Sequence, residues 1–170
     1  MAQTQTNTVA SGTTQFKTLI SSAQTTIDVV GLDGDSAKRF SIEFQIKKQE
    51  AGGGILYLEL NADTANHADL LFVWSTGFGL GGGTHAYWYE SDVSGANTLG
   101  AGRGTILTDR SGGRVRVSSD SRLDLATSTT TYNTALDGIY TPSGNITSVR
   151  LRLGSGNFAA GSYLAVRFDK

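Results

Sequence analysis

Apolar and polar residues alternate with a period of two along most of this chain. Between residues 41 and 47, Ile42, Phe44 and Ile46 fall on one side of an extended backbone and polar residues on the other. Further segments with strand character are 25–31, 54–61, 69–74, 85–90, 104–109, 113–119, 121–127, 148–154 and 162–168. The residues that the clearest of these patterns bury are Leu56, Leu58, Leu60, Val115, Val117, Val149, Leu151, Leu153, Leu164, Val166 and Phe168. Such alternation predicts sheets with one buried face.

Glycine-rich turns separate these segments, and no segment has an apolar 3.6-residue repeat over three helical turns. Glycine supplies 22 of the 170 residues, whereas Pro142, in a predicted turn, is the single proline. About ten short strands joined in this way predict an all-β fold, an antiparallel β-sandwich with a jelly-roll-like topology. An immunoglobulin-like sandwich is the alternative.

The first 24 residues differ from the rest because they are mainly Thr, Gln, Ser and Asn with scattered apolar residues. A segment of this composition is weakly ordered by itself or is ordered by pairing with another subunit. We therefore expect an N-terminal arm over residues 1–24 and a single β-sandwich domain over residues 25–170. Neither a signal peptide nor a membrane partner is expected, because the N-terminus lacks a basic start and no stretch approaches the ~18 apolar residues of a membrane span.

The charge balance and the cysteine count exclude several classes of partner and site. Lys and Arg total 14 and Asp and Glu total 15, which gives a formal net charge of −1. Since acidic and basic residues are interleaved, no nucleic-acid partner is expected. The absence of cysteine excludes disulfides, thiolate metal sites and cysteine nucleophiles. We expect no bound cofactor.

The turn GLDGDS, residues 31–36, is acidic enough to suggest a metal site. A calcium-binding loop beginning at Asp33 needs Asp or Asn at its fifth position, Gly at its sixth and a carboxylate at its twelfth, but this chain has Ala, Lys and Phe there. The residues instead predict a turn closed by an aspartate side chain, with glycine at positive φ. A weak Ca²⁺ site at Asp33 and Asp35, completed by oxygen ligands from another loop, is the alternative.

A formal G-x-G-x-x-G motif at Gly77, Gly79 and Gly82 follows a predicted strand. A dinucleotide site needs a helix directly after these glycines, because the helix N-terminus holds the pyrophosphate. The residues that follow, HAYWYES, are predicted to form a strand. We therefore interpret the glycines as a flexible hairpin loop.

No pattern indicates catalysis. The two imidazoles, His67 and His85, lack H-x-x-x-H spacing, and a G-x-S-x-G nucleophile is absent. The acidic residues form no cluster in the sequence, although a spatial pair of carboxylates, as in glycosidases, is an alternative that sequence spacing leaves open. We expect no catalytic residues and no enzyme activity.

Aromatic residues concentrate at Trp74, Tyr87, Trp88 and Tyr89. On a strand, Trp88 points opposite to its two neighbours, so one set is predicted to be buried and the other exposed. An exposed set is suited either to a subunit interface or to stacking on a sugar ring.

Arginines alternate along the polar faces of two predicted strands; they are Arg114, Arg116, Arg150 and Arg152. Guanidinium groups in this arrangement can make bidentate pairs across an interface with another protein. Alternatively, they are charges that protect exposed sheet faces and edges from aggregation.

The C-terminal sequence SGNITSVRLRLGSGNFAAGSYLAVRFDK, residues 143–170, resembles the closing segment of small β-sandwich structural proteins of tailed-bacteriophage virions. Those proteins end in an "ITS-hydrophobic" strand, a Ser/Gly/Asn turn and a Gly-Ser pair before the last strand. The segment GLDGDSAKRFSIEFQI is similar to their turn before a strand, and LYLELNAD to a strand that follows. Family members often finish in LYG, whereas this chain ends in VRFDK.

The resemblance implies a non-catalytic virion component. A head decoration (cement) protein is the first expectation; such proteins often form trimers on the capsid lattice and contact the major capsid protein. The second is a tail-tip or fibre module that binds carbohydrate on the host surface. A carbohydrate-binding jelly roll attached to a secreted enzyme is the third, and it is weakened by the absence of a recognisable signal peptide and linker.

Overall fold

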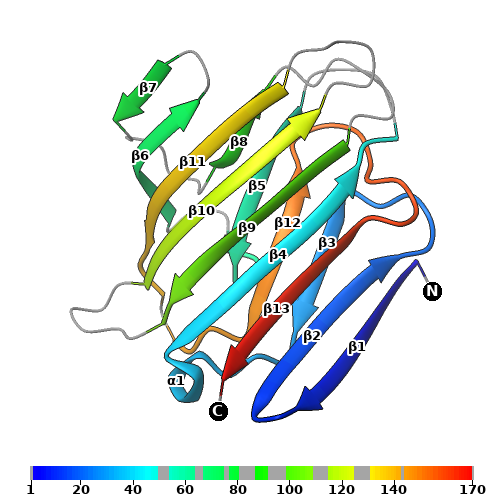
Figure 1. Cartoon of the computed structure of the whole chain (residues 1–170), viewed down its shortest axis with the longest axis vertical. Helices are drawn as coiled ribbons and strands as arrows, with labels where there is room; N and C mark the ends of the chain where they lie inside the picture. Colours follow the sequence, from blue (N-terminus) through cyan, green and yellow to red (C-terminus); the bar gives the residue numbers. More distant parts are fainter. Residues whose placement is uncertain are drawn as a thin grey trace.

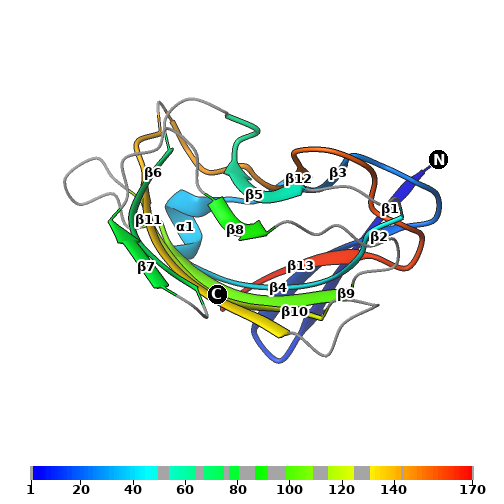
Figure 2. The same ribbon diagram turned by 90° about the horizontal axis from the view of Figure 1, so that it is seen from above.

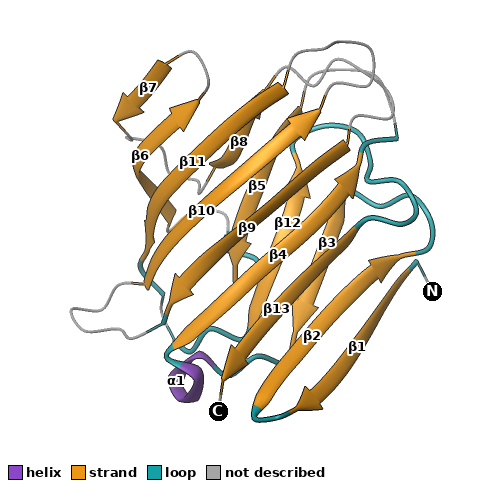
Figure 3. Cartoon of the chain, in the orientation of Figure 1, coloured by secondary structure: helices purple, strands orange, loops and turns teal. Residues whose placement is uncertain are grey.

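Strands dominate the computed structural model, which describes residues 2–49, 54–63, 67–74, 77–80, 87–91, 99–108, 115–124, 131–142 and 144–169 (Figure 3). The strands are β1 (Gln3–Ala10), β2 (Thr13–Ile20), β3 (Thr26–Val30), β4 (Arg39–Lys47), β5 (Gly54–Leu60), β6 (His67–Trp74), β7 (Gly77–Leu80), β8 (Tyr87–Ser91), β9 (Leu99–Leu107), β10 (Val115–Asp124), β11 (Thr131–Tyr140), β12 (Ser148–Leu153) and β13 (Tyr163–Asp169). Within the described residues the one helix is a single turn, α1 (Gly34–Ala37). The prediction of an all-β protein is confirmed.

Two antiparallel sheets form a sandwich. The larger sheet has the order β1-β2-β13-β4-β9-β10-β11-β6-β7, and the smaller has the order β3-β12-β5-β8. Figure 1 places the larger sheet in front of the smaller one, and Figure 2 shows it curving around the smaller one. The four strands β2-β13-β4-β9 lie opposite the smaller sheet, and the chain crosses repeatedly between the two. This order is that of a jelly roll, which confirms the predicted sandwich, and the remaining strands extend the larger sheet on both sides.

The residues that face inward are those that the alternation predicted. Ile42, Phe44 and Ile46 on β4 are at most 4% exposed. The same holds on the strands opposite, where Leu58 and Leu151 are fully buried. Phe168 is only partly buried, but it packs against the core, where it stacks on the ring of Phe16 and meets the ring of Phe40 edge to face. One continuous cluster of side chains from both sheets therefore makes the hydrophobic core.

The expected N-terminal arm is wrong, because residues 3–20 form a hairpin within the larger sheet. β2 pairs with β13, and its Phe16 and Ile20 belong to the core. Ser11 and Gly12, both with positive φ, make the two-residue turn between β1 and β2. The alternation of β2 was hidden because threonines share its inward face with these two apolar residues, and β-branched threonine fits a strand well.

Glycine hid part of another strand. β9 begins at Leu99, within a segment predicted to be a turn, and its Gly100, Gly102 and Gly104 lie opposite Ile46, Phe44 and Ile42 of β4. Glycines on this face leave room for the large side chains of the neighbouring strand. The structure also adds β7 and β11, which the alternation did not predict, and it merges two expected strands into the continuous β10.

Candidate functional site

The acidic turn is the cap of α1. Asp33 accepts hydrogen bonds from the backbone N–H of Ser36 at 3.3 Å and from its hydroxyl at 2.7 Å. Asn145 donates to the same carboxylate at 2.9 Å and accepts the backbone N–H of Asp35 at 2.9 Å. These hydrogen bonds, that of the Ser36 hydroxyl most of all, lower the pKa of Asp33 below its ordinary value. Gly31 has a φ of 77°, so the prediction of an aspartate-closed turn with glycine at positive φ is confirmed.

Both carboxylate oxygens of Asp33 thus already have protein donors. Within the described ranges, no group of three or more His, Asp or Glu side chains is arranged to hold a metal ion. The G-x-G-x-x-G segment is described only in part. Gly77 and Gly79 belong to β7, and the next described element is β8, a strand, so the hairpin-loop interpretation of these two glycines is replaced by a strand. Gly82 and His85 lie outside the described residues.

A network of charges covers the outer face of the smaller sheet, and we call it the arginine ladder. It consists of Asp28 on β3, Arg150 and Arg152 on the central strand β12, and Glu59 and Tyr57 on β5. Arg150 lies between Asp28 and Glu59, its register partners on either side, and its Nε donates to Asp28. Arg152 Nε donates to Glu59 Oε1 at 2.6 Å, and its guanidinium lies 4.1 Å from the centre of the Tyr57 ring.

Glu59 is the centre of the arginine ladder and is only 2% exposed. Among the described residues, none donates a hydrogen bond to its second oxygen, Oε2, which lies 3.9 Å from Nη1 of Arg150. The two guanidinium groups therefore compensate one buried carboxylate, which is costly to desolvate alone. Arg150 and Arg152 therefore pair with carboxylates of their own sheet. Their role in an interface or in protecting an exposed face stays a prediction.

The remaining predicted contact residues are spread over other strands. Arg116 is exposed on β10 of the larger sheet, and Arg114 lies outside the described residues. Trp74 is the last residue of β6, and Tyr87 and Trp88 begin β8. The side chains of these three aromatic residues are outside the described part, so their exposure stays a prediction.

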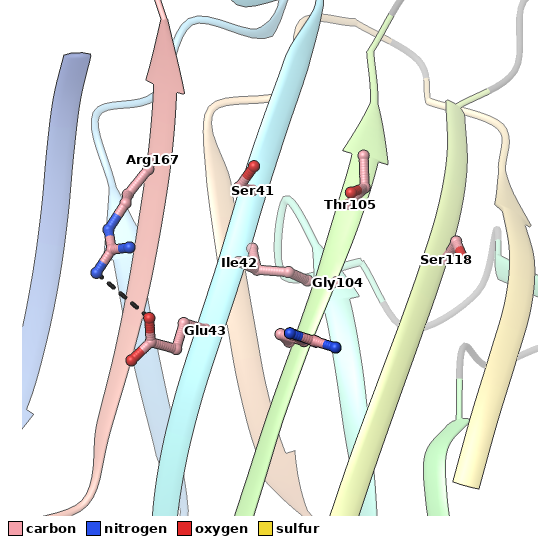
Figure 4. A pocket seen from close by; sticks show the side chains of 8 residues that line it. Ser41, Ile42, Glu43, Gly104, Thr105, Ser118 and Arg167 are labelled. Carbon is pink, nitrogen blue, oxygen red and sulfur yellow. Dashed lines mark ion pairs between the residues drawn. The ribbon is translucent and has the colours of Figure 1, made fainter.

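A shallow groove of about 370 Å³ crosses the outer face of the larger sheet (Figure 4). Its floor contains a row of short hydroxyl side chains, because Ser41, Thr105 and Ser118 are cross-strand partners on β4, β9 and β10. Longer charged side chains stand around this row, so the surface is hollowed between them. The lining residues are Ser41, Ile42, Glu43, Arg103, Gly104, Thr105, Ser118 and Arg167.

The charges of this groove are more loosely held than those of the arginine ladder. Arg167 pairs with Glu43 at 3.3 Å, and both side chains are more than 40% exposed. Tyr163 donates its hydroxyl to the same carboxylate at 2.7 Å. This hydrogen bond, followed by burial, raises the pKa of Tyr163. No hydrogen bond or ion pair joins the exposed Arg103 side chain to another side chain in the described part of the chain.

Side chains of β1 cover the edge of the smaller sheet. Gln5 donates to the carbonyl of Val30 at 2.8 Å and accepts its N–H at 2.9 Å. Gln3 does the same with the carbonyl of Thr26 at 2.9 Å and the N–H of Asp28 at 3.2 Å. Each amide thus makes the two hydrogen bonds that a neighbouring strand would otherwise make with β3. We call this arrangement the glutamine clasp.

The sequence patterns predict neither the glutamine clasp nor the row of short hydroxyl side chains in the groove. Glutamines at positions 3 and 5 recur with a period of two inside a run of threonines, which is a signal that they share one face. Nothing in the sequence marks Ser41, Thr105 and Ser118 as neighbours, because strand order alone brings them together.

Comparison with protein-family models, with curated proteins and with solved structures finds no match to this chain. In the part of the chain that the structure describes, no helix is long and apolar enough to cross a bilayer.

Proposed function

We propose that this chain is a non-enzymatic structural protein of a virion, and that it acts as a capsid decoration (cement) protein. In this role it binds the major capsid protein or other virion proteins and stabilises the head lattice through many weak contacts. Several copies of one small contact add through multivalency, and binding to the assembled state stabilises that state by mass action. The chain functions as a homo-oligomer, for which the resemblance favours a trimer.

The observation that carries this proposal is the strand order of the sandwich. The strands β2-β13-β4-β9 over β3-β12-β5-β8 make a double-sheet jelly roll, an architecture that recurs in viral capsid and lectin domains. The support is an analogy of fold, and the patches of sequence that resemble phage virion proteins point the same way. The structural use of three carboxylates also supports a non-enzymatic role. The carboxylates of Asp28, Asp33 and Glu59 are engaged in contacts that hold strands and loops together.

The experiment that tests the proposal is the copy number of this protein in purified particles, measured by quantitative mass spectrometry against the major capsid protein. A decoration protein is present at a copy number comparable with that of the capsid protein. A few copies per particle indicate the tail and contradict the proposal. Recombinant protein added to expanded capsids that lack it should restore their thermal stability, whereas unexpanded capsids serve as the control.

The groove on the larger sheet favours a second candidate function, a tail-tip or fibre module that binds host carbohydrate. Its volume lies within the ~300–1,000 Å³ of small-ligand sites, and it combines hydroxyls with the exposed guanidinium of Arg103. A fibre module binds host cells and ignores capsids. Glycan binding that Arg103→Ala abolishes places the ligand in the groove, whereas loss only with Trp88→Ala places it at the aromatic strand β8.

A further inference from the structure

One long side of β1 is open. Because Ser11 and Gly12 form a two-residue turn, Ala10 and Thr13 are a hydrogen-bonded pair, and such pairs recur at every second residue of the hairpin. The hydrogen bond from Ser21 N–H to the carbonyl of Ala2 agrees with this order. The backbone groups that point away from the sheet are therefore those of Gln3, Gln5, Asn7 and Val9. Among the described residues, none forms a backbone hydrogen bond with these outward groups.

The other sheet edges are protected, and β1 is the exception. β7 has only four residues, and β8 has five, with Glu90 among them. The edge of β3 is occupied by the glutamine clasp. β1, in contrast, has eight residues in unbroken register with β2 and contains no charge, no proline and no bulge. Short length, charge, proline and bulges are the devices that keep an edge from pairing with another chain, and β1 has none of them.

The open edge is also held in place. The glutamine clasp fixes Gln3 and Gln5 through two hydrogen bonds each, so β1 is ordered before any partner arrives. Pairing with an ordered strand costs less conformational entropy than pairing with a mobile segment. Val9, which is 63% exposed, lies on the same strand and gains burial when a strand is added beside it.

We infer that two copies of this chain pair through β1, antiparallel and around a two-fold axis at Thr6. This register places Gln5 opposite Asn7 of the second copy and Gln3 opposite Val9 of the second copy, so all outward groups find partners. An axis at Asn7 would set Gln3 against the turn residue Ser11 and lose that pair. No like charges meet, because residues 3–10 carry none. The two larger sheets join into one continuous sheet across an isologous interface.

This inference goes beyond the proposed function and does not depend on it. A two-fold contact along β1 uses a different part of the molecule from the groove and from the outer faces of the sheets. It is compatible with a decoration role on a capsid and with a carbohydrate-binding role, but it gives a two-fold dimer in place of the trimer that the resemblance favours. Its failure leaves the copy-number experiment unaffected.

The test uses the absence of native cysteine. In the inferred dimer, the two Thr6 residues form a non-hydrogen-bonded pair with Cα atoms about 4.5 Å apart, within the range for a disulfide. A Thr6→Cys variant should form a disulfide-linked dimer rapidly under mild oxidation, read on a non-reducing gel. Thr8→Cys is the matched control on the same strand, because its two sulfhydryls lie about 14 Å apart in this register. Crosslinking of Thr6→Cys that is no faster than that of Thr8→Cys overturns the arrangement.

The oligomeric state provides the second measurement. Light scattering after gel filtration should give the native chain as a dimer. Asn7→Pro removes one outward N–H without touching the β1–β2 hydrogen bonds, and it should weaken dimerisation about tenfold or more. Asn7→Lys adds like charges near the axis and should act in the same direction. Circular dichroism establishes that both variants are folded. A monomeric native chain, or an oligomer whose mass survives both substitutions, contradicts the inference.

Discussion

The two sheets of this sandwich use the charges on their outer faces differently. On the smaller sheet, Arg150 and Arg152 share the buried Glu59. On the larger sheet, Glu43 and Arg167 pair in the open, at side-chain exposures of 44% and 48%. A charged side chain on a polar strand face is therefore accessible to another protein only where the neighbouring side chains of its own sheet leave it exposed. The larger sheet is therefore the better place to look for contacts with other molecules.

The same contrast holds at the edges that lie side by side at one end of the sandwich. The edge of β3 is satisfied by amide side chains, whereas the edge of β1 is not. A closed edge stabilises the monomer, and an open edge is suited to association. The β1–β2 hairpin therefore covers the edge of the smaller sheet with its glutamine side chains and leaves the edge of the larger sheet open to a further strand.

Removing one glutamate from each sheet should give the largest difference in stability between the two sheets. Glu59→Ala should lower the free energy of unfolding by about 2–4 kcal/mol, because two partly buried guanidinium groups lose their shared acceptor. Glu43→Ala should lower it by at most about 1 kcal/mol, since its ion pair is exposed. Urea unfolding followed by fluorescence measures both. Equal losses in the two variants would show that the sheets do not differ in this respect.

Removing one arginine from each sheet should likewise affect stability to different extents. Arg152→Ala should cost about 1–2 kcal/mol, because it removes the hydrogen bond to Glu59 and the packing on Tyr57. Arg103→Ala should change stability by no more than about 0.5 kcal/mol, the usual range for an exposed surface position. Thermal and urea unfolding of the two variants under one set of conditions provide the measurement. A costly Arg103→Ala would mean that the groove holds the fold together.

The glutamine clasp predicts a local effect at the edge of the smaller sheet. Gln5→Ala should destabilise the chain by about 1 kcal/mol and speed hydrogen exchange at the Val30 amide, which loses its acceptor. Asn7→Ala is the matched control, because Asn7 lies on the same face of β1 and no hydrogen bond of its side chain to a described residue is found. Unchanged exchange at Val30 in Gln5→Ala would contradict the clasp.

The smallest effect concerns pH. The pKa of Tyr163 is raised above its unfolded value of 10.0, chiefly by the hydrogen bond to Glu43. The folded state therefore favours the neutral phenol, and this contribution to stability is present below about pH 10 and is lost as pH rises through the folded pKa. Glu43→Gln should lower the pKa of one tyrosine in a spectrophotometric titration. Tyr163→Phe should remove that tyrosine from the titration altogether, which identifies it.

Much of the fold could be predicted because alternation acts locally. Each residue of a strand points opposite to its neighbour, so Ile42, Phe44 and Ile46 identify a buried face without knowledge of the partner strand. The prediction failed where the inward and outward residues of a strand do not differ clearly in polarity, as with the threonines of β2 and the glycines of β9. There the burial of small or hydroxyl residues depends on what the neighbouring strand presents.

The all-β sandwich, its inward residues and the aspartate-capped turn follow from the amino-acid order alone, because each depends on residues close together in the chain. Which charges meet depends instead on how the strands pack. Arg150 and Asp28 are 122 residues apart in sequence, and Arg152 and Glu59 are 93 apart. Strand order and register bring them together, and both arise from the packing of the whole core. A polar residue on a strand face therefore shows its role only when its neighbours across the sheet are known.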